Sequence, residues 1–505
     1  MKKLFSLIIL VVIAMSAAGQ TYNTNLKATM LLKNGGWKKD AEVNINSFVH
    51  TFVEDKYGIV TEHFYITDSD NNRLDVNSNF SSCFDFEYNT IQDLWDASVI
   101  ENVLFTLKNK GYQFKLRSEM ELEALEYVSN VKKYGLELDD PYLQTYIYGL
   151  VAKIAPQYLI DGRTSSINII IQENPSVNAC CYPNGTIVLN TGLLAVLHSE
   201  DELVAILAHE ISHYVLDHSI QNINATIARE KRAQIWAAIA TGVTAVAEGY
   251  IASQNEYYVP GAATMGMAVV SSTIASQVIK NLGMEYNHQQ EYEADKLAKE
   301  VLEILGSDKD ALATALSRLE QECISNRNNV MYDNSYTHPA LMTRIQKAGT
   351  PSDLKDKTFE KIISFAVSSV ALMKYSNYRF HQCLPYVSQN IDNGVATSDD
   401  YIIKANCLLS TKYGDENNEE IFSLINKAKS IDEDNLNVYK TEIIATLRNN
   451  DIINAIDLLN QYVAFLDSYT IENVRSERTW ESLNEFIVTE NAWARKMLVK
   501  LRGMK

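Results

Sequence analysis

His209-Glu210-Ile211-Ser212-His213 is the stretch that decides the fold of this 505-residue chain. Residues four apart lie on one face of an α-helix, so His209 and His213 can present both imidazoles to one metal ion. Glu210, the next residue along the helix, can reach a water molecule at that metal and act as its general base. The chain has only nine histidines, which makes a chance match rare. The motif therefore predicts a zinc hydrolase site, against the alternative of a surface helix with two incidental histidines.

The residues around the motif predict a capped helix with a buried stripe. Ser199 and Glu202 have the spacing of a capping box. Apolar residues follow at helical spacing: Leu203, Val204, Ile206, Leu207, Ile211 and Val215. His218 lies about 180° round the helix from His209, and no glycine follows His213 to turn the chain back. We therefore expect His218 to be structural or to orient a ligand rather than to bind the metal.

A zinc site needs a third protein ligand, and residues 285–300 contain the best candidate. Glu291 and Asp295 are four apart and share a helix face, whereas Glu293 points roughly the other way. Glu291 can bind the metal while Asp295 accepts a hydrogen bond from a ligand imidazole and fixes its tautomer. The alternative is a solvated acidic helix face, which is the usual meaning of such a run. The upstream HExxH motif favours the metal site.

Four stretches occur in a characteristic order between residues 178 and 344. They are residues 178–194, the HExxH motif with His218, Glu291-Tyr292-Glu293-Ala294-Asp295, and Thr337-His338-Pro339 with Arg344. Together they resemble the zinc metalloproteases that include the CAAX prenyl protease, HtpX and the BepA-like periplasmic enzymes. The resemblance implies that Glu291 is the third zinc ligand and Asp295 its orienting partner. It also implies that His338 gates the metal or assists the developing oxyanion. We expect Arg344 to support the ligands from behind or to assist the oxyanion.

The segment before the motif predicts a small β-structure. Residues 167–171 and 187–189 are β-prone, and Pro183-Asn184-Gly185 is typical of a turn between strands. If Asn178, Ala179, Cys180 and Cys181 form an exposed edge, a peptide substrate can bind there by strand addition. The alternative is an ordinary hairpin that covers the helix. We expect Cys180 and Cys181 to be small buried packing residues rather than a redox pair.

The amino terminus has the pattern of a secretory signal peptide over residues 1–19. Met1-Lys2-Lys3 precedes an apolar run, and Ser16-Ala17-Ala18-Gly19 provides small residues for cleavage. An uncleaved anchor is the alternative. The mature chain is therefore expected in the periplasm or outside the cell, with contact to a membrane surface left open. The formal net charge of −18, without a basic patch, argues against a nucleic-acid partner.

The pattern along the chain predicts an α+β fold, mainly α, in three parts after the signal peptide. Residues 20–115 read as a β-rich module, with strands near 27–32, 42–52 and 59–67 and a helix over 91–108. Residues 116–356 read as an HExxH zincin protease domain. Its insert at 233–283 is almost uncharged, which predicts a helical hairpin or, alternatively, two membrane spans.

Residues 357–505 read as a helical domain. Amphipathic segments at 398–409, 418–428, 435–447 and 452–465 resemble tetratricopeptide-type helix pairs, and a plain helical bundle is the alternative. In either case the helices offer a surface for an envelope protein partner or a client.

These features predict a zinc-dependent endopeptidase of the cell envelope, with one Zn²⁺ per chain and protein or peptide substrates. Misfolded or unassembled proteins are the expected substrates. The alternative is a chaperone-like or scaffold protein that acts through its helical repeats while the zinc site is latched or vestigial. The intact Glu210 favours the enzyme, because a vestigial site has no need of a general base.

Overall fold

The computed structural model describes most of the chain in two compact units, residues 20–359 and 360–503, which we treat separately. The described residues are 20–31, 38–54, 60–75, 84–107, 112–159, 163, 165–229, 284, 286–325, 341–353, 355–411, 418–468 and 477–503. The predicted signal peptide, the insert at 233–283 and His338 lie outside them. The fold is mainly helical with a β-rich amino-terminal module, which confirms the predicted α+β class. The domain limits predicted at residues 115 and 356 stay predictions.

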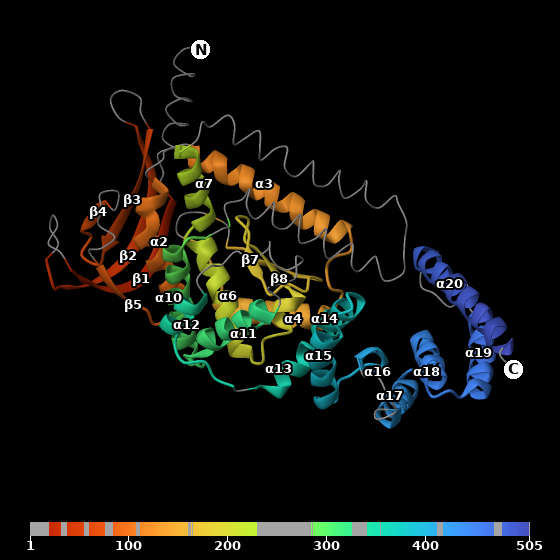
Figure 1. Ribbon diagram of the computed structural model, residues 1–505. Helices are drawn as coiled ribbons and strands as arrows, with labels where there is room; N and C mark the ends of the chain where they lie inside the picture. Colours follow the sequence, from red (N-terminus) through yellow and green to blue (C-terminus); the bar gives the residue numbers. More distant parts are fainter. Residues whose placement is uncertain are drawn as a thin grey trace, which may run out of the picture. The chain divides into compact units, whose positions relative to one another are not determined.

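The first unit begins with an antiparallel five-stranded sheet in the order β4-β3-β2-β1-β5 (Figure 1). Its strands are β1 (Gln20–Met30), β2 (Glu42–Glu54), β3 (Val60–Asp68), β4 (Arg73–Asp75) and β5 (Phe84–Glu87). Leu26, Phe48 and Ile66 point from neighbouring strands into one core and are fully buried. The three predicted strands are confirmed, but β1 starts earlier than predicted because residues 20–23 also pair with β2.

Trp95 connects this sheet to the rest of the unit. It lies in α2 (Ile91–Leu107), which packs against β1, and its ring is fully buried. The indole Nε1 donates a hydrogen bond of 2.8 Å to the carbonyl of Ile154, the last residue of α4 (Pro141–Ile154). Burial of the ring with its N–H satisfied makes Trp95 a strong structural anchor between the two helices.

A second sheet has the strand order β6-β8-β7 and lies beside the motif helix. Its strands are β6 (Asn168–Gln172), β7 (Ala179–Cys181) and β8 (Thr186–Asn190), with β6 parallel and β7 antiparallel to β8. The predicted turn between β7 and β8 contains Gly185 at φ +79°, a conformation that favours glycine. β7 is the outer strand of this sheet, but its three side chains are buried rather than exposed.

The HExxH motif lies in α6 (Glu200–Val215), which packs against α10 (His288–Leu305), α11 (Ala311–Ser325) and β7 (Figure 1). Ser199 caps the helix by accepting a hydrogen bond of 3.3 Å from the backbone N–H of Glu202. The Glu202 carboxylate accepts from the backbone N–H of His198, at 3.2 Å, which differs from the reciprocal bond of a capping box. Every residue from Glu202 to Val215 is buried, so the helix is enclosed on all sides and not along a single stripe.

The chain turns sharply at Asp217, immediately after α6. Asp217 adopts φ +55°, which is uncommon for a residue other than glycine. Arg163 holds this turn by donating to the carbonyls of Tyr214 and Val215, at 2.7 and 2.6 Å, and by pairing with the Asp217 carboxylate at 2.8 Å. Arg117 pairs with the same carboxylate. The turn brings His218, the first residue of α7 (His218–Arg229), back against the motif helix.

Three further helices belong to the first unit, and a fourth lies at its boundary. They are α3 (Tyr112–Lys133), α5 (Thr191–Leu194) and α12 (Leu341–Ala348), while α13 (Lys357–Ile362) spans the boundary between the units. The helix α10 begins with a capping box between Asn287 and Gln290 and ends at Gly306, which has φ +69°. These local signals fix both ends of the helix that carries Glu291.

The second unit consists of successive helices, each packed against the next. They are α14 (Ser364–Ser376), α15 (Phe380–Asp392), α16 (Ser398–Thr411), α17 (Asn418–Ile431), α18 (Leu436–Arg448), α19 (Ile452–Ser468) and α20 (Glu477–Arg502). The four helices predicted between residues 398 and 465 are confirmed as helices α16 to α19. Their interpretation as tetratricopeptide-type pairs stays a prediction. Among the described helices of both units, none is long and apolar enough to cross a membrane.

Candidate metal centre

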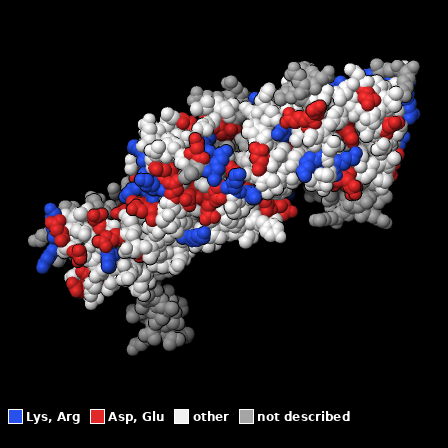
Figure 2. Space-filling view, turned by 90° about the horizontal axis from the view of Figure 1, so that it is seen from below, with Lys and Arg blue, Asp and Glu red and all other residues white. Residues whose placement is uncertain are grey.

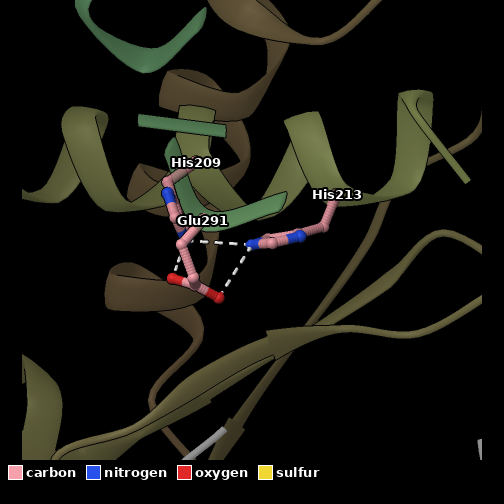
Figure 3. Close-up of side chains that lie close together, drawn as sticks. All are labelled: His209, His213 and Glu291. Carbon is pink, nitrogen blue, oxygen red and sulfur yellow. Dashed lines mark hydrogen bonds and ion pairs between the residues drawn. The ribbon is translucent and has the colours of Figure 1, made fainter. Parts of the chain in front are cut away.

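His209, His213 and Glu291 converge from two helices on one point (Figure 3). The two histidines extend from neighbouring turns of α6, and Glu291 reaches them from the first turn of α10. Nε2 of His209 and Nε2 of His213 are 3.0 Å apart. The Glu291 oxygens lie 3.6 Å from Nε2 of His209 and 3.7 Å from Nε2 of His213. All three side chains are buried, so the surrounding core fixes their positions.

These separations fit the donor set of a zinc ion. Two ligand atoms about 2.0–2.1 Å from one zinc at the tetrahedral angle lie about 3.4 Å from each other. The three observed separations of 3.0, 3.6 and 3.7 Å bracket that value. The short distance between the two Nε2 atoms also suits a cation, because both lone pairs can point at the same positive centre. Two imidazoles and one carboxylate are a ligand set that leaves a fourth position open, as in catalytic zinc sites.

The charges of the buried groups also call for a divalent cation. Glu210, Glu291 and Asp295 place three carboxylates in the site, and Arg344 supplies one guanidinium. As ionised groups these four sum to −2, which a Zn²⁺ ion would neutralise. Buried charges are costly unless they are paired or coordinate a metal.

Asp295 and Arg344 support the first ligand. A carboxylate oxygen of Asp295 lies 2.9 Å from Nδ1 of His209, the ring atom opposite the metal position. Arg344 of α12 donates to both oxygens of Asp295, at 2.7 and 2.8 Å, and its Nη1 lies 2.5 Å from Glu291. Burial alone would raise the pKa of Asp295, but His209 and Arg344 outweigh it and hold that pKa well below its usual range. Asp295 is therefore an ionised acceptor that fixes the His209 tautomer.

The second ligand, His213, has different neighbours. Its Nδ1 lies 2.7 Å from Nδ1 of His218, and its ring stacks on Tyr286 with centroids 3.7 Å apart and planes at 10°. Burial lowers the pKa of His218, which favours the neutral ring. Tyr286 precedes α10 and is absent from the residues expected at the site. No helical spacing relates it to the motif, so the sequence contains no signal for this contact.

The residues of the site fall within a segment that a known protein family shares. The model of "Peptidase family M48" matches residues 141–352, which contain both helices that carry the three candidate ligands. This segment belongs to peptidase family M48. The resemblance stated from the sequence is therefore confirmed.

Curated relatives that this chain matches include proteases from bacteria and mitochondria. The "Beta-barrel assembly-enhancing protease" of Escherichia coli (strain K12) is 28% identical over 240 residues, or 47% of this chain and 44% of the relative. The "Mitochondrial metalloendopeptidase OMA1" of Schizosaccharomyces pombe is 26% identical over 126 residues, or 25% of this chain and 37% of the relative. The chain thus spans less than half the length of these relatives.

Within the M48 segment, most of the predicted site residues lie together. A continuous series of contacts joins His218, His213, His209, Glu291, Asp295 and Arg344. Arg344 contacts the carboxylates of Glu291 and Asp295, so it is placed to hold these two side chains. His218 is close to His213 although the helical wheel placed it on the far side, because α6 ends before the turn at Asp217. His338 lies outside the described residues.

The predicted substrate strand lies next to the motif helix. Burial and the nearby Glu210 carboxylate both raise the pKa of the Cys180 and Cys181 thiols. Neither cysteine is in a disulfide, and both are buried. They have the environment of packing residues, and β7 packs against α6 close enough for the Glu210 charge to act on both thiols.

Proposed function

We propose that this chain is a zinc-dependent endopeptidase of the cell envelope. The observation that carries the proposal is the convergence of His209, His213 and Glu291 at zinc-ligand separations. The motif places Glu210 directly after the first ligand, where a general base is needed. The match to an M48 peptidase model and the proteases among the relatives support the same chemistry.

The proposed mechanism divides the work among residues of the site. His209, His213 and Glu291 would hold the Zn²⁺ ion, which lowers the pKa of water toward neutrality and polarises the scissile carbonyl. Glu210 accepts the proton of the attacking water and passes it to the leaving amine. Asp295 and Arg344 keep His209 and Glu291 in place. His338 is proposed to assist the oxyanion or to gate the site.

We further propose that an extended peptide binds along residues 178–181. β7 is the outer strand of its sheet and lies against α6, which supports binding by strand addition. Its residues are buried in this structure, so the proposal requires this edge to open to the peptide. Such binding uses the peptide backbone and suits substrates of varied sequence. Misfolded or unassembled envelope proteins are substrates of this kind. The name of the Escherichia coli relative refers to β-barrel assembly, which supports a substrate or partner of that class here.

The remaining parts of the proposal concern location and partners. The signal-peptide pattern of residues 1–19 supports a periplasmic or secreted protein. Helices α14 to α20 would bind an envelope protein or a client, whether or not they are tetratricopeptide-type repeats. On the face shown in Figure 2, lysine and arginine side chains are interspersed with aspartate and glutamate. Together with the net charge of −18, this distribution favours protein over nucleic-acid partners.

Removal of the metal tests the proposed activity. Treatment of the full chain with 1,10-phenanthroline is expected to slow cleavage of fluorescein-labelled casein by at least about 100-fold, because zinc supplies both the nucleophile and the carbonyl activation. Dialysis followed by Zn²⁺ should restore cleavage, whereas Mg²⁺ should not.

Two results would contradict the proposal. Undiminished cleavage by the metal-depleted chain would exclude zinc proteolysis. Binding of unfolded protein without any cleavage, at full zinc occupancy, would support the chaperone-like alternative.

A further inference from the structure

His213 turns the nitrogen opposite the metal position toward His218. The two Nδ1 atoms are 2.7 Å apart, and both rings are buried. An imidazole that binds a metal through Nε2 carries its proton on Nδ1 and donates it to a partner. His218 must then accept through its own Nδ1, which leaves the proton of the neutral His218 ring on Nε2.

Glu293 lies beside the Nε2 atom of His218. Its Oε2 is 3.3 Å from that nitrogen, and its Oε1 accepts a hydrogen bond of 2.8 Å from Gln289. At this distance the Glu293 carboxyl group is placed to accept the Nε2 proton of a neutral His218. On the helical wheel Glu293 points away from Glu291, and in the structure this direction leads to His218.

Two further contacts restrict the orientation of this pair of imidazoles. Gln290 donates from Nε2 to the backbone carbonyl of His218 at 3.3 Å. Tyr286 stacks on the His213 ring, and its hydroxyl lies 3.1 Å from Oγ of Ser219 in α7. Rotation of the His213 ring would break its stacking on Tyr286, and the Gln290 bond holds the His218 backbone in place. The start of α10 thus supplies Glu291 and also the groups that surround His213.

We propose that His218 and Glu293 are positioning residues that fix the tautomer and plane of this second ligand imidazole. His218 is hydrogen-bonded to His213, and Glu293 contacts His218 at 3.3 Å. His209 has a separate support in Asp295 and Arg344, so each ligand histidine is held by its own carboxylate. The series of contacts from His213 through His218 to Glu293 has one more residue than the contact between His209 and Asp295. It ends near the surface, since the Glu293 side chain is 40% exposed. This inference rests on the proposed function, because it requires that His213 binds the metal.

The test compares Glu293→Gln and His218→Phe with the wild-type chain. Glutamine keeps the size and an acceptor but removes the charge, whereas phenylalanine keeps a ring and removes the acceptor and donor. Zinc affinity is measured by competition with a chromophoric chelator, and the geometry of the site by the visible absorption spectrum of the Co²⁺-substituted protein. We expect affinity to fall about 10-fold for Glu293→Gln and up to about 100-fold for His218→Phe, with an altered Co²⁺ spectrum.

Glu303→Gln is the matched control, because Glu303 is an exposed glutamate of the same helix. It should keep wild-type affinity and spectrum. Wild-type values in Glu293→Gln and His218→Phe would overturn the positioning role and leave the proposed function intact. Failure of the wild type itself to bind zinc or Co²⁺ would overturn both. If His218→Phe does not fold, the affinity and spectrum of Glu293→Gln decide the outcome alone.

Discussion

Glu210→Gln is expected to slow peptide cleavage by about 10²- to 10⁴-fold, the usual contribution of a positioned general base. Glutamine has nearly the same size but cannot accept the proton of the attacking water. The zinc content should stay at the wild-type level, because Glu210 is not among the three converging ligand groups. Turnover of a fluorogenic peptide and metal analysis of the same sample measure the two quantities together.

The same substitution at Glu200 is the control for Glu210→Gln. Glu200 is at the start of the same helix, and its side chain is 40% exposed. We expect Glu200→Gln to cleave at the wild-type rate. Wild-type turnover by Glu210→Gln would show that another group serves as the base. If Glu210→Gln also lost its zinc, the loss of the metal would account for the lower activity, and the result would not support a general-base role.

Arg344→Met is expected to destabilise the metal-free protein by about 3–5 kcal/mol, the usual result of removing one partner from a buried ion pair. The guanidinium lies 2.5 Å from Glu291 and 2.7 Å from Asp295, and only 1% of Arg344 is exposed. Without it, two buried carboxylates face each other across the site. Zinc restores part of the balance at Glu291, so the zinc-loaded variant should lose less stability. Chemical denaturation with and without zinc measures both differences.

Lys347→Met is the control, because it removes the same charge from an exposed position of α12. Its ammonium group lies 3.4 Å from the centroid of the Tyr292 ring, a contact that contributes about 0.5–1 kcal/mol at an exposed site. Equal destabilisation by the two substitutions would contradict a charge-balancing role for Arg344. The charge-balancing role would also be contradicted if Arg344→Met lost the same stability with and without zinc.

The two histidine ligands were predictable because their spacing reflects helix geometry. His209 and His213 follow from the four-residue period, and the cap at Ser199 marks where their helix begins. Glu291 is far from them in sequence, so no local rule connects it to the motif. Its prediction depended on a second helical pair, Glu291 and Asp295, and on the family resemblance.

The position of His218 could not be derived from the motif alone. A continuous helix would carry it away from His213, but α6 ends and Asp217 adopts a left-handed conformation. That conformation depends on Arg163 and Arg117, which are 54 and 100 residues away in the chain. Tyr286 likewise reaches His213 only through the packing of α10 on α6. Long-range contacts of this kind leave no periodic pattern in the sequence.

The metal content of the purified full chain tests the central claim most directly. Wild type should contain one zinc per chain, because two imidazoles and a carboxylate converge at the required separations. Glu291→Ala should bind zinc at least about 100-fold more weakly, since loss of a ligand exceeds the effect of losing an orienting partner. Glu303→Ala, on the same helix, should keep its zinc. Unchanged zinc content and affinity in Glu291→Ala would contradict the proposed site.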